Sequence, residues 1–213
     1  FDAFSVGNNL GLVVPILLAI ILRKDFSHGT VRNKIISGHS RVSIFLSMYA
    51  VCFAVLWVIM LLHALLTMCV SLIFFDYQAG GFAAGDLIYL LESIFFQMLV
   101  YLFISAFVSW LCAAAKNVGV VIVLYVAVVL VMSLITGILS VSIEILKFDS
   151  DNETLVNVLT TIQRINVFNS TTNIGSGTSY TLSDTLYNLF PPVIGAAGLL
   201  GLGILGFKKK DLK

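Results

Sequence analysis

The sequence predicts an all-α membrane protein, a polytopic bundle of helices that cross the bilayer several times. Hydrophobic residues make up 59% of the 213-residue chain and charged residues only 11%, whereas a soluble domain has about 45–50% apolar and about 25% charged residues. The mean hydropathy is +1.04. The apolar residues also form long runs separated by polar segments, which is the pattern of membrane-spanning helices.

The positive charges indicate which polar segments lie in the cytoplasm. Of the 12 Lys and Arg residues, all but Lys147 and Arg164 lie in residues 23–41, at Lys116 or in residues 208–213. Short cytoplasmic loops of membrane proteins collect these two residue types. We therefore expect these three segments, and with them the C-terminus, on the cytoplasmic side.

The apolar runs then predict one transmembrane domain over residues 1–213. Its five visible spans are residues 4–22, 42–75, 87–115, 118–146 and 184–207. Pro15 is expected to kink the first span. The second span is much longer than the roughly 20 residues that a bilayer requires, so its first turns are expected to extend into the cytoplasm. Lys116 and Asn117 predict a tight turn, and Pro191 with Pro192 is expected to break the last span.

Residues 147–183 form the only sizeable polar region and are predicted to be extracellular. Ser150 and Glu153 have the spacing of a capping box. Apolar residues then recur at helical spacing, at Leu155, Val158, Leu159, Ile162 and Ile165. This pattern predicts an amphipathic helix over residues 151–167, with its apolar stripe on the membrane surface or capping the bundle. Residues 169–181 are rich in Asn, Ser, Thr and Gly and predict a loop.

A polar segment with several cations, residues 25–41, separates the first two spans and reads DFSHGTVRNKIISGHSR. Val31 and Ile35 are four residues apart and would share one face of a helix, whereas Arg32 and Lys34 would point elsewhere. Thr30 is a candidate N-cap and Gly38 a candidate left-handed C-cap. A helix this short is not stable alone, so its apolar face needs a surface on which to dock. The simplest interpretation is a cytoplasmic loop whose cations anchor it at the membrane.

The same segment resembles the coupling helix of bacterial ABC type-2 permeases, which lies between their second and third spans. The resemblance is carried by Asp25-Phe26-x-x-Gly29-Thr30-Val31-Arg32-Asn33-Lys34-Ile35-Ile36-x-Gly38-x-Ser40-Arg41. In that family the helix inserts into a groove of the ATP-hydrolysing subunit. The residues that the resemblance implies for this coupling are Gly29, Thr30, Val31, Arg32, Asn33, Lys34, Ile35, Ile36, Gly38 and Arg41.

The resemblance also implies an assembly and a location. Two ATPase subunits would bind ATP and Mg, and a second permease chain, identical or different, would complete the path within the membrane lipid. One further span is expected before Phe1, which makes six in all, in the plasma membrane of a bacterium. The sequence has no phosphate-binding GxxxxGK[ST] loop, so this chain is expected to be no enzyme and to bind no ATP by that motif. We expect no cofactor in the chain and no nucleic-acid partner.

The function implied is ATP-driven export by alternating access. The resemblance is nearest to the branch that exports peptide toxins and antimicrobial peptides, so the substrate is expected to be hydrophobic or amphipathic. Two alternatives remain. One is a type-2 permease for a lipid, a saccharide, a drug or an ion. The other is a non-pumping membrane scaffold or channel-like subunit, in which residues 25–41 would be a lipid-facing anchor.

Polar residues within the spans are the candidates for the transport path. Ionisable groups in the membrane are costly and often mark a pathway. Glu92, with Ser93 and Gln97 on one helical face, is therefore expected to line the path. His63 is a further candidate, with a hydrogen bond between helices as the alternative. Pro191 and Pro192, together with the helix at residues 151–167, are expected to form the outer gate.

The sequence shows no catalytic or metal-binding pattern. It contains no CxxC, HExxH or paired-histidine spacing. The three cysteines, Cys52, Cys69 and Cys112, all lie in apolar runs, and an odd number of cysteines there argues against a disulfide framework. An intramembrane serine protease built on Ser176 is disfavoured, because His63 is the only histidine in a predicted span and a serine nucleophile needs a nearby base.

Overall fold

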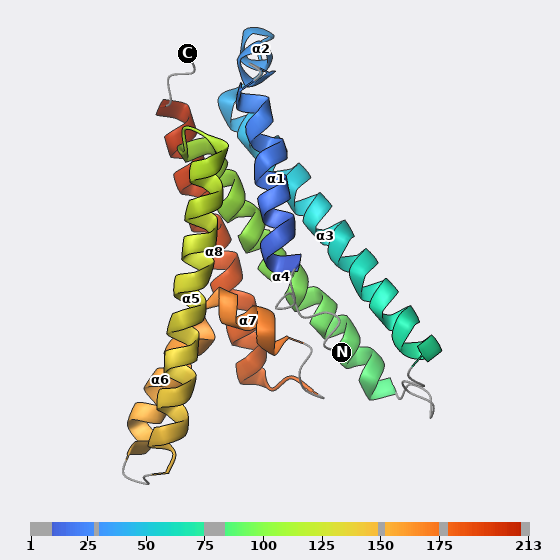
Figure 1. Cartoon of the computed structure of the whole chain (residues 1–213), viewed down its shortest axis with the longest axis vertical. Coiled ribbons are helices and arrows are strands. Elements are labelled where there is room, and N and C mark those ends of the chain that lie inside the picture. Colours follow the sequence, from blue (N-terminus) through green and yellow to red (C-terminus); the bar gives the residue numbers. More distant parts are fainter. Residues whose placement is uncertain (1–9, 28–29, 75–83, 149–151, 175–178, 210–213) are drawn as a thin grey trace.

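The computed structural model describes residues 10–27, 30–74, 84–148, 152–174 and 179–209. Within these residues the chain forms helices and no strands. Figure 1 shows long helices side by side, with the short α2 at one end and α6 and α7 toward the other. The helices are α1 (Leu10–Ser27), α2 (Thr30–Ile36), α3 (Arg41–Phe74), α4 (Ala84–Ala114), α5 (Val118–Leu146), α6 (Glu153–Ile165), α7 (Val167–Asn173) and α8 (Leu182–Lys209).

Among the described residues, four helices are long and apolar enough to cross a membrane: α3, α4, α5 and α8. They coincide with four of the predicted spans and indicate a membrane protein. Many large apolar side chains on their outer surfaces are exposed, as lipid contact requires. The fifth predicted span corresponds in part to α1, but residues 1–9 lie outside the described residues, so the count of five spans stays a prediction.

Helix α4 is the centre of the bundle. It packs against α1, α3, α5, α7 and α8, and its contact with α8 is the most extensive in the protein. Two glycines of α8 allow close packing with its neighbours: Gly195 lies against the ring of Phe103 on α4, and Gly203 lies against the ring of Phe45 on α3. Small residues let membrane helices approach closely where the hydrophobic effect gives little drive to associate.

The predicted turn between α4 and α5 is confirmed. Helix α4 ends at Ala114 and α5 begins at Val118. Asn117 has an extended backbone, and its side-chain oxygen accepts a hydrogen bond from the Val120 amide at 2.9 Å. This N-cap satisfies one of the free amides at the start of a helix. It lets the chain reverse direction within three residues.

The helix predicted over residues 151–167 and the loop predicted after it both need correction. The chain forms two helices, α6 and α7, which meet at Asn166. The Asn166 side chain accepts a hydrogen bond from the Phe168 amide at 3.1 Å and so starts α7, which continues to Asn173 through part of the expected loop. The N-cap of α6 is Asn152, whose side chain makes no capping hydrogen bond to this helix. Ser150, the residue expected to cap this helix, lies outside the described residues.

Helix α6 folds back along α5, as Figure 1 shows. The side-chain amide of Gln163 donates to the Ser140 hydroxyl at 2.7 Å, and that of Asn166 donates to the Thr136 hydroxyl at 2.9 Å. The apolar stripe of α6 is about half exposed: Leu155, Val158, Ile162 and Ile165. The polar bonds therefore hold α6 against a neighbouring helix and leave the apolar stripe uncovered.

The prediction that Pro191 and Pro192 break the last span is wrong, since both lie inside a continuous α8. A proline removes one backbone hydrogen bond, and membrane helices tolerate this loss when their surroundings compensate. A capping box fixes the start of α8 well before the prolines. Thr181 Oγ1 accepts from the Asp184 amide at 3.2 Å, and the Asp184 carboxylate accepts from the Thr181 amide at 3.0 Å and its hydroxyl at 2.6 Å.

Candidate functional site

Helix α2 forms a separate, docked unit at one end of the bundle, which we call the α2 end. Of its seven residues, Val31 is buried with only 2% of its surface exposed, and Ile35 packs against the same core. Helix α2 contacts both α1 and α3. The docking surface that so short a helix needs is thus supplied by the chain itself. Thr30 is the first residue of the helix, and Gly29 lies outside the described residues.

The end of α2 is a Schellman motif, as the glycine position predicted. Gly38 has a φ of +92°, which a residue with a side chain rarely adopts. The His39 amide donates to the Lys34 carbonyl at 3.1 Å, and the Gly38 amide donates to the Ile35 carbonyl at 3.0 Å. These two bonds satisfy carbonyls that a helix end otherwise leaves free. The direction in which the chain leaves α2 is therefore fixed.

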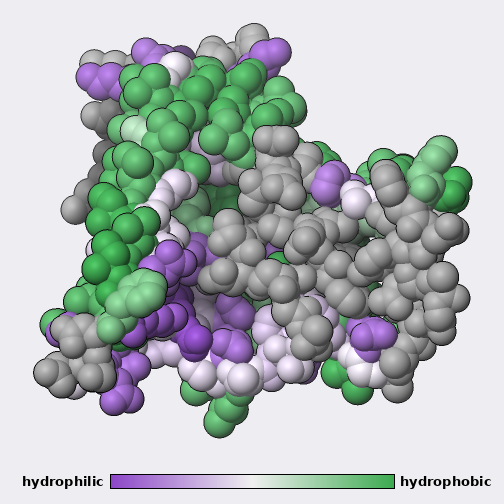
Figure 2. All heavy atoms as spheres, turned by 60° about the horizontal axis from the view of Figure 1, so that its bottom comes forward, coloured by the Kyte–Doolittle hydropathy of each residue, from purple (hydrophilic) through white to green (hydrophobic). Residues whose placement is uncertain are grey.

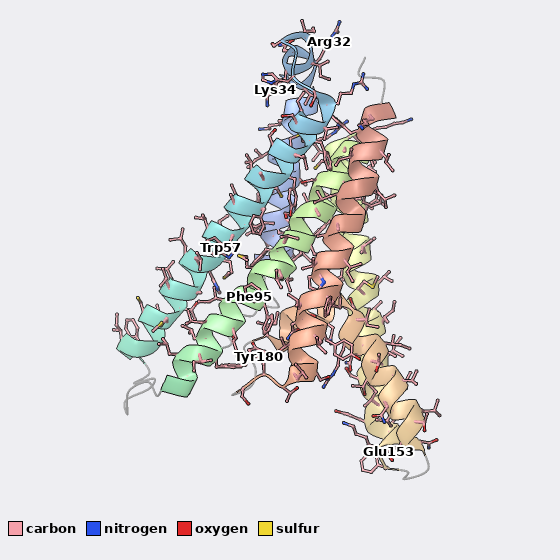
Figure 3. All side chains as sticks on the ribbon, turned by 180° about the vertical axis from the view of Figure 1, so that it is seen from behind. Arg32, Lys34, Trp57, Phe95, Glu153 and Tyr180 are labelled. Carbon is pink, nitrogen blue, oxygen red and sulfur yellow. The ribbon has the colours of Figure 1, made fainter. Side chains whose placement is uncertain are left out.

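The outward surface of α2 carries Arg32, Asn33 and Ile36, of which Ile36 is 73% exposed. Figure 3 shows Arg32 at the tip of the molecule, with Lys34 also on this helix. In this conformation Val31 lies in the core of this chain, so Ile36 is the apolar side chain that α2 presents outward, and the coupling role of these residues stays a prediction. The exposed surface combines one apolar side chain with a cation.

Two arginines at the α2 end hold the carboxyl ends of other helices. Arg41 at the start of α3 donates to the Lys208 carbonyl of α8 at 3.0 Å. Arg23 of α1 donates to the carbonyls of Cys112, in the last turn of α4, and Lys116, just beyond it. Cations at the carboxyl end of a helix interact favourably with its free carbonyls and dipole. Partial burial lowers the pKa of Arg23 from its ordinary value, which is high enough for the guanidinium to keep its charge.

Two of the residues predicted to line a path are sealed inside the bundle. Ser93 and Gln97, both on α4, have no exposed surface. Ser93 donates to the Tyr89 carbonyl at 2.8 Å, and its oxygen lies 2.8 Å from the Tyr180 hydroxyl. Both polar atoms of the Gln97 amide lack a hydrogen-bond partner. Such a buried, unsatisfied amide is destabilising by about 1–3 kcal/mol.

The other two predicted path residues are not gathered with them. Glu92 lies on an exposed face of α4, and His63 of α3 is half-buried. In the part of the chain that the structure describes, no hydrogen bond or ion pair joins Glu92 or His63 to Ser93 or Gln97. The four predicted residues therefore do not form one polar site in this conformation.

A polar pocket at the opposite end, which we call the α6 end, was missed from the sequence. It has a volume of about 360 Å³ and lies between α4, α6, α7 and α8. Its wall includes the buried Asn169, Ser170 and Asn188. Figure 2 shows hydrophilic side chains gathered in a hollow at this end, beside strongly hydrophobic surface. All of its lining residues except Tyr89 lie within residues 160–188. They come from three different helices and the segment before α8, so no single helical pattern marks them.

Aromatic rings close the inner side of this pocket. Tyr180 stacks on Tyr89 with ring centres 4.8 Å apart and meets Phe96 edge-on at 5.0 Å. Figure 3 shows Tyr180 beside the lower part of α4. Its hydroxyl, bonded to Ser93, joins the pocket to the polar side chains within α4. Gln97 follows Ser93 by one helical turn on the same side of α4.

The prolines predicted to form a gate lie next to this end of the bundle. Pro191 borders an apolar groove between α6 and α8, and Pro192 is buried. Ser176 lies outside the described residues. Within the described ranges no cluster of His, Cys, Asp and Glu could hold a metal ion, and none of Cys52, Cys69 and Cys112 forms a disulfide.

Comparison of the chain with protein families, with curated proteins and with solved structures finds no match.

Proposed function

We propose that this chain is the permease subunit of an ATP-driven exporter of the ABC type-2 kind, in the plasma membrane of a bacterium. It acts with separate ATPase subunits and with a second permease chain. The observation that carries the proposal is α2, a short helix docked on its own chain, closed by a fixed C-cap, and exposing Arg32, Asn33 and Ile36 at the tip of the molecule. This is the form that a coupling helix requires.

The connection from α2 to the long helices is short and ordered. The Ser40 hydroxyl accepts from the Ser43 amide at 3.1 Å, which caps the start of α3. Helix α3 has 34 residues, a length of about 51 Å at 1.5 Å per residue. Arg41 also joins the start of α3 to the end of α8. A force on α2 thus passes directly to two long helices, which fits a pump driven from this end.

The buried polar side of α4 supports a transport path that opens in another conformation. The buried Gln97 amide has no partner here, and a helix shift that exposes it to water or to a substrate would satisfy it. The buried polar side chains of the described residues are hydroxyls and amides, with no charge among them. A hydrophobic or amphipathic peptide, such as a toxin or antimicrobial peptide, is the substrate class that we propose.

The test is reversal of the charges on α2. We expect the tagged chain, purified from its own cells, to bring with it an ATPase that has a phosphate-binding loop. Arg32→Glu combined with Lys34→Glu should reduce the co-purified ATPase at least about tenfold, since charge-assisted contacts contribute about 1.5–3 kcal/mol each. Lys147→Glu is the matched control, because Lys147 is exposed and follows α5 at the α6 end.

Two results would overturn the proposal. One is the absence of any ATPase from the wild-type preparation, which favours the scaffold or channel-like alternative. The other is a charge-reversed variant that retains both the ATPase and transport-coupled hydrolysis in proteoliposomes. If neither result is found, stimulation of ATP hydrolysis by candidate peptides would identify the substrate class.

A further inference from the structure

An apolar groove lies beside the polar pocket at the α6 end. Its volume is about 530 Å³, and it runs between α6 and the first turns of α8. Ile165, Leu186 and Phe190 line it and are about half exposed. Tyr187 lines both the groove and the polar pocket. The apolar groove and the polar pocket are therefore neighbours that share the Tyr187 side chain as a common wall.

A single ion pair stands at the boundary between the two. Arg164 of α6 lies 3.4 Å from the Asp184 carboxylate of α8. The same guanidinium donates to the Ser183 hydroxyl at 3.0 Å and lies 5.7 Å from the centre of the Tyr187 ring. These contacts are the polar links between α6 and α8 in the described residues.

The two members of this pair differ in how they are held. The capping bonds from Thr181 hold Asp184 at the start of α8. Arg164 has a long side chain near the end of α6 and is about one third exposed. Partly exposed ion pairs of this kind contribute little to stability. The guanidinium can therefore turn to another anion while the carboxylate stays in place.

We propose that this site binds one phospholipid with a phosphoethanolamine head group, from the leaflet on the α6 side of the membrane. An acyl chain fills the groove along Leu186 and Phe190, and the head group enters the polar pocket. The phosphate accepts hydrogen bonds from Arg164, and the ammonium group donates to Asp184, so the zwitterion replaces both halves of the ion pair. Charge-assisted bonds of this type are the strong ones.

The head group follows from the chemistry of the pair. A choline head group has no N–H to donate to Asp184. A glycerol head group offers no cation, so its phosphate would take Arg164 and leave the Asp184 carboxylate beside a second anion with no cationic partner. The neighbouring amides and hydroxyls, including Asn188 and Tyr187, suit a small polar head group. This inference rests on residues other than those of α2 and is independent of the proposed export function.

The experiment is native mass spectrometry of the full chain in detergent, titrated with phosphatidylethanolamine, phosphatidylglycerol or phosphatidylcholine of identical acyl chains. We expect one tight site for phosphatidylethanolamine and about tenfold weaker binding of the other two. Arg164→Gln should weaken the binding of phosphatidylethanolamine about tenfold, because the hydrogen bonds from the guanidinium to the phosphate are lost. Arg32→Gln, a change at the α2 end, should leave it unchanged.

A second variant and a second ligand keep the test decisive. Leu186→Gln should weaken all three lipids through the groove, and glycerophosphoethanolamine, which has no acyl chain, should not displace the bound lipid. Equal binding of the three lipids, or unaltered binding by folded Arg164→Gln as judged by circular dichroism, would overturn the proposal. Arg164→Gln should still co-purify any ATPase, so the two proposals fail separately.

Discussion

The contact between α3 and α8 gives a sharp test of the packing at the α2 end. A Cβ atom added at Gly203 of α8 would lie 2.3 Å from the Cζ atom of Phe45. Phe45 is fully buried and packs against Phe207, with ring centres 6.1 Å apart. The ring is therefore enclosed by neighbouring side chains. Gly203→Ala must either displace this ring or move the two helices apart.

The expected cost follows from this overlap. Carbon atoms prefer separations of about 3.5–4.0 Å, so the new methyl group would come more than about 1 Å too close. Forcing extra atoms into a packed core costs about 1–3 kcal/mol. For a chain of this size each kcal/mol lowers the midpoint of thermal unfolding by about 2–4 °C. We therefore expect Gly203→Ala to lower that midpoint by about 2–12 °C.

The assay is thermal unfolding of purified protein in one detergent, compared with two variants. Gly201→Ala is the matched control, since an added Cβ there meets no atom within 4 Å. It should leave the midpoint unchanged or raise it slightly, because alanine favours a helix over glycine. Phe45→Leu removes the clashing Cζ atom and should restore part of the loss when combined with Gly203→Ala. Equal midpoints for the two alanine variants would refute the packing described for α3 and α8.

Three further predictions concern other parts of the chain. Gln97→Leu should raise the free energy of unfolding by about 1–3 kcal/mol, because it removes a buried unsatisfied amide. It should also reduce transport in proteoliposomes. Unchanged or lower stability would contradict the account of Gln97. Gly38→Ala should lower the free energy of unfolding by about 1–2 kcal/mol, because alanine is strained at a positive φ. Hydrogen exchange of the α2 amides should become faster, and unchanged exchange would argue against the C-cap. Asn166→Ala should lower the free energy of unfolding by about 1–2 kcal/mol through loss of the α7 cap. Hydrogen exchange of the amides at residues 167–173 should then become faster, and unchanged exchange would contradict the cap.

The long helices could be predicted because the bilayer imposes a simple requirement of length and apolarity. The predicted span at residues 118–146 has the same bounds as α5, and the other three agree within a few residues at each end. The break predicted in the last span is absent because the packing of α8 against α4 outweighs the local tendency of Pro191 and Pro192 to interrupt a helix. The true start of this span was marked by Thr181 and Asp184, which have capping-box spacing.

The candidate site could be predicted only in part. Gly38 was identified because a left-handed helix end specifically favours glycine. The pattern of Val31 and Ile35 showed an apolar face but not its partner, since a face that docks on its own chain has the same spacing as one that docks on another protein. The pocket at the α6 end was missed because residues such as Arg164 and Asp184 meet only after the chain has folded.

The dominance of the contact between α4 and α8 has a consequence for biosynthesis. The ribosome releases α4 into the membrane well before α8 has been made, so the contact between the Phe103 ring and Gly195 forms only after α8 has been inserted. During this interval the central helix is only partly enclosed. Nascent chains that stall before residue 182 should therefore be recognised by membrane quality control and degraded, so the supply of finished protein depends on the speed with which its final helix is inserted.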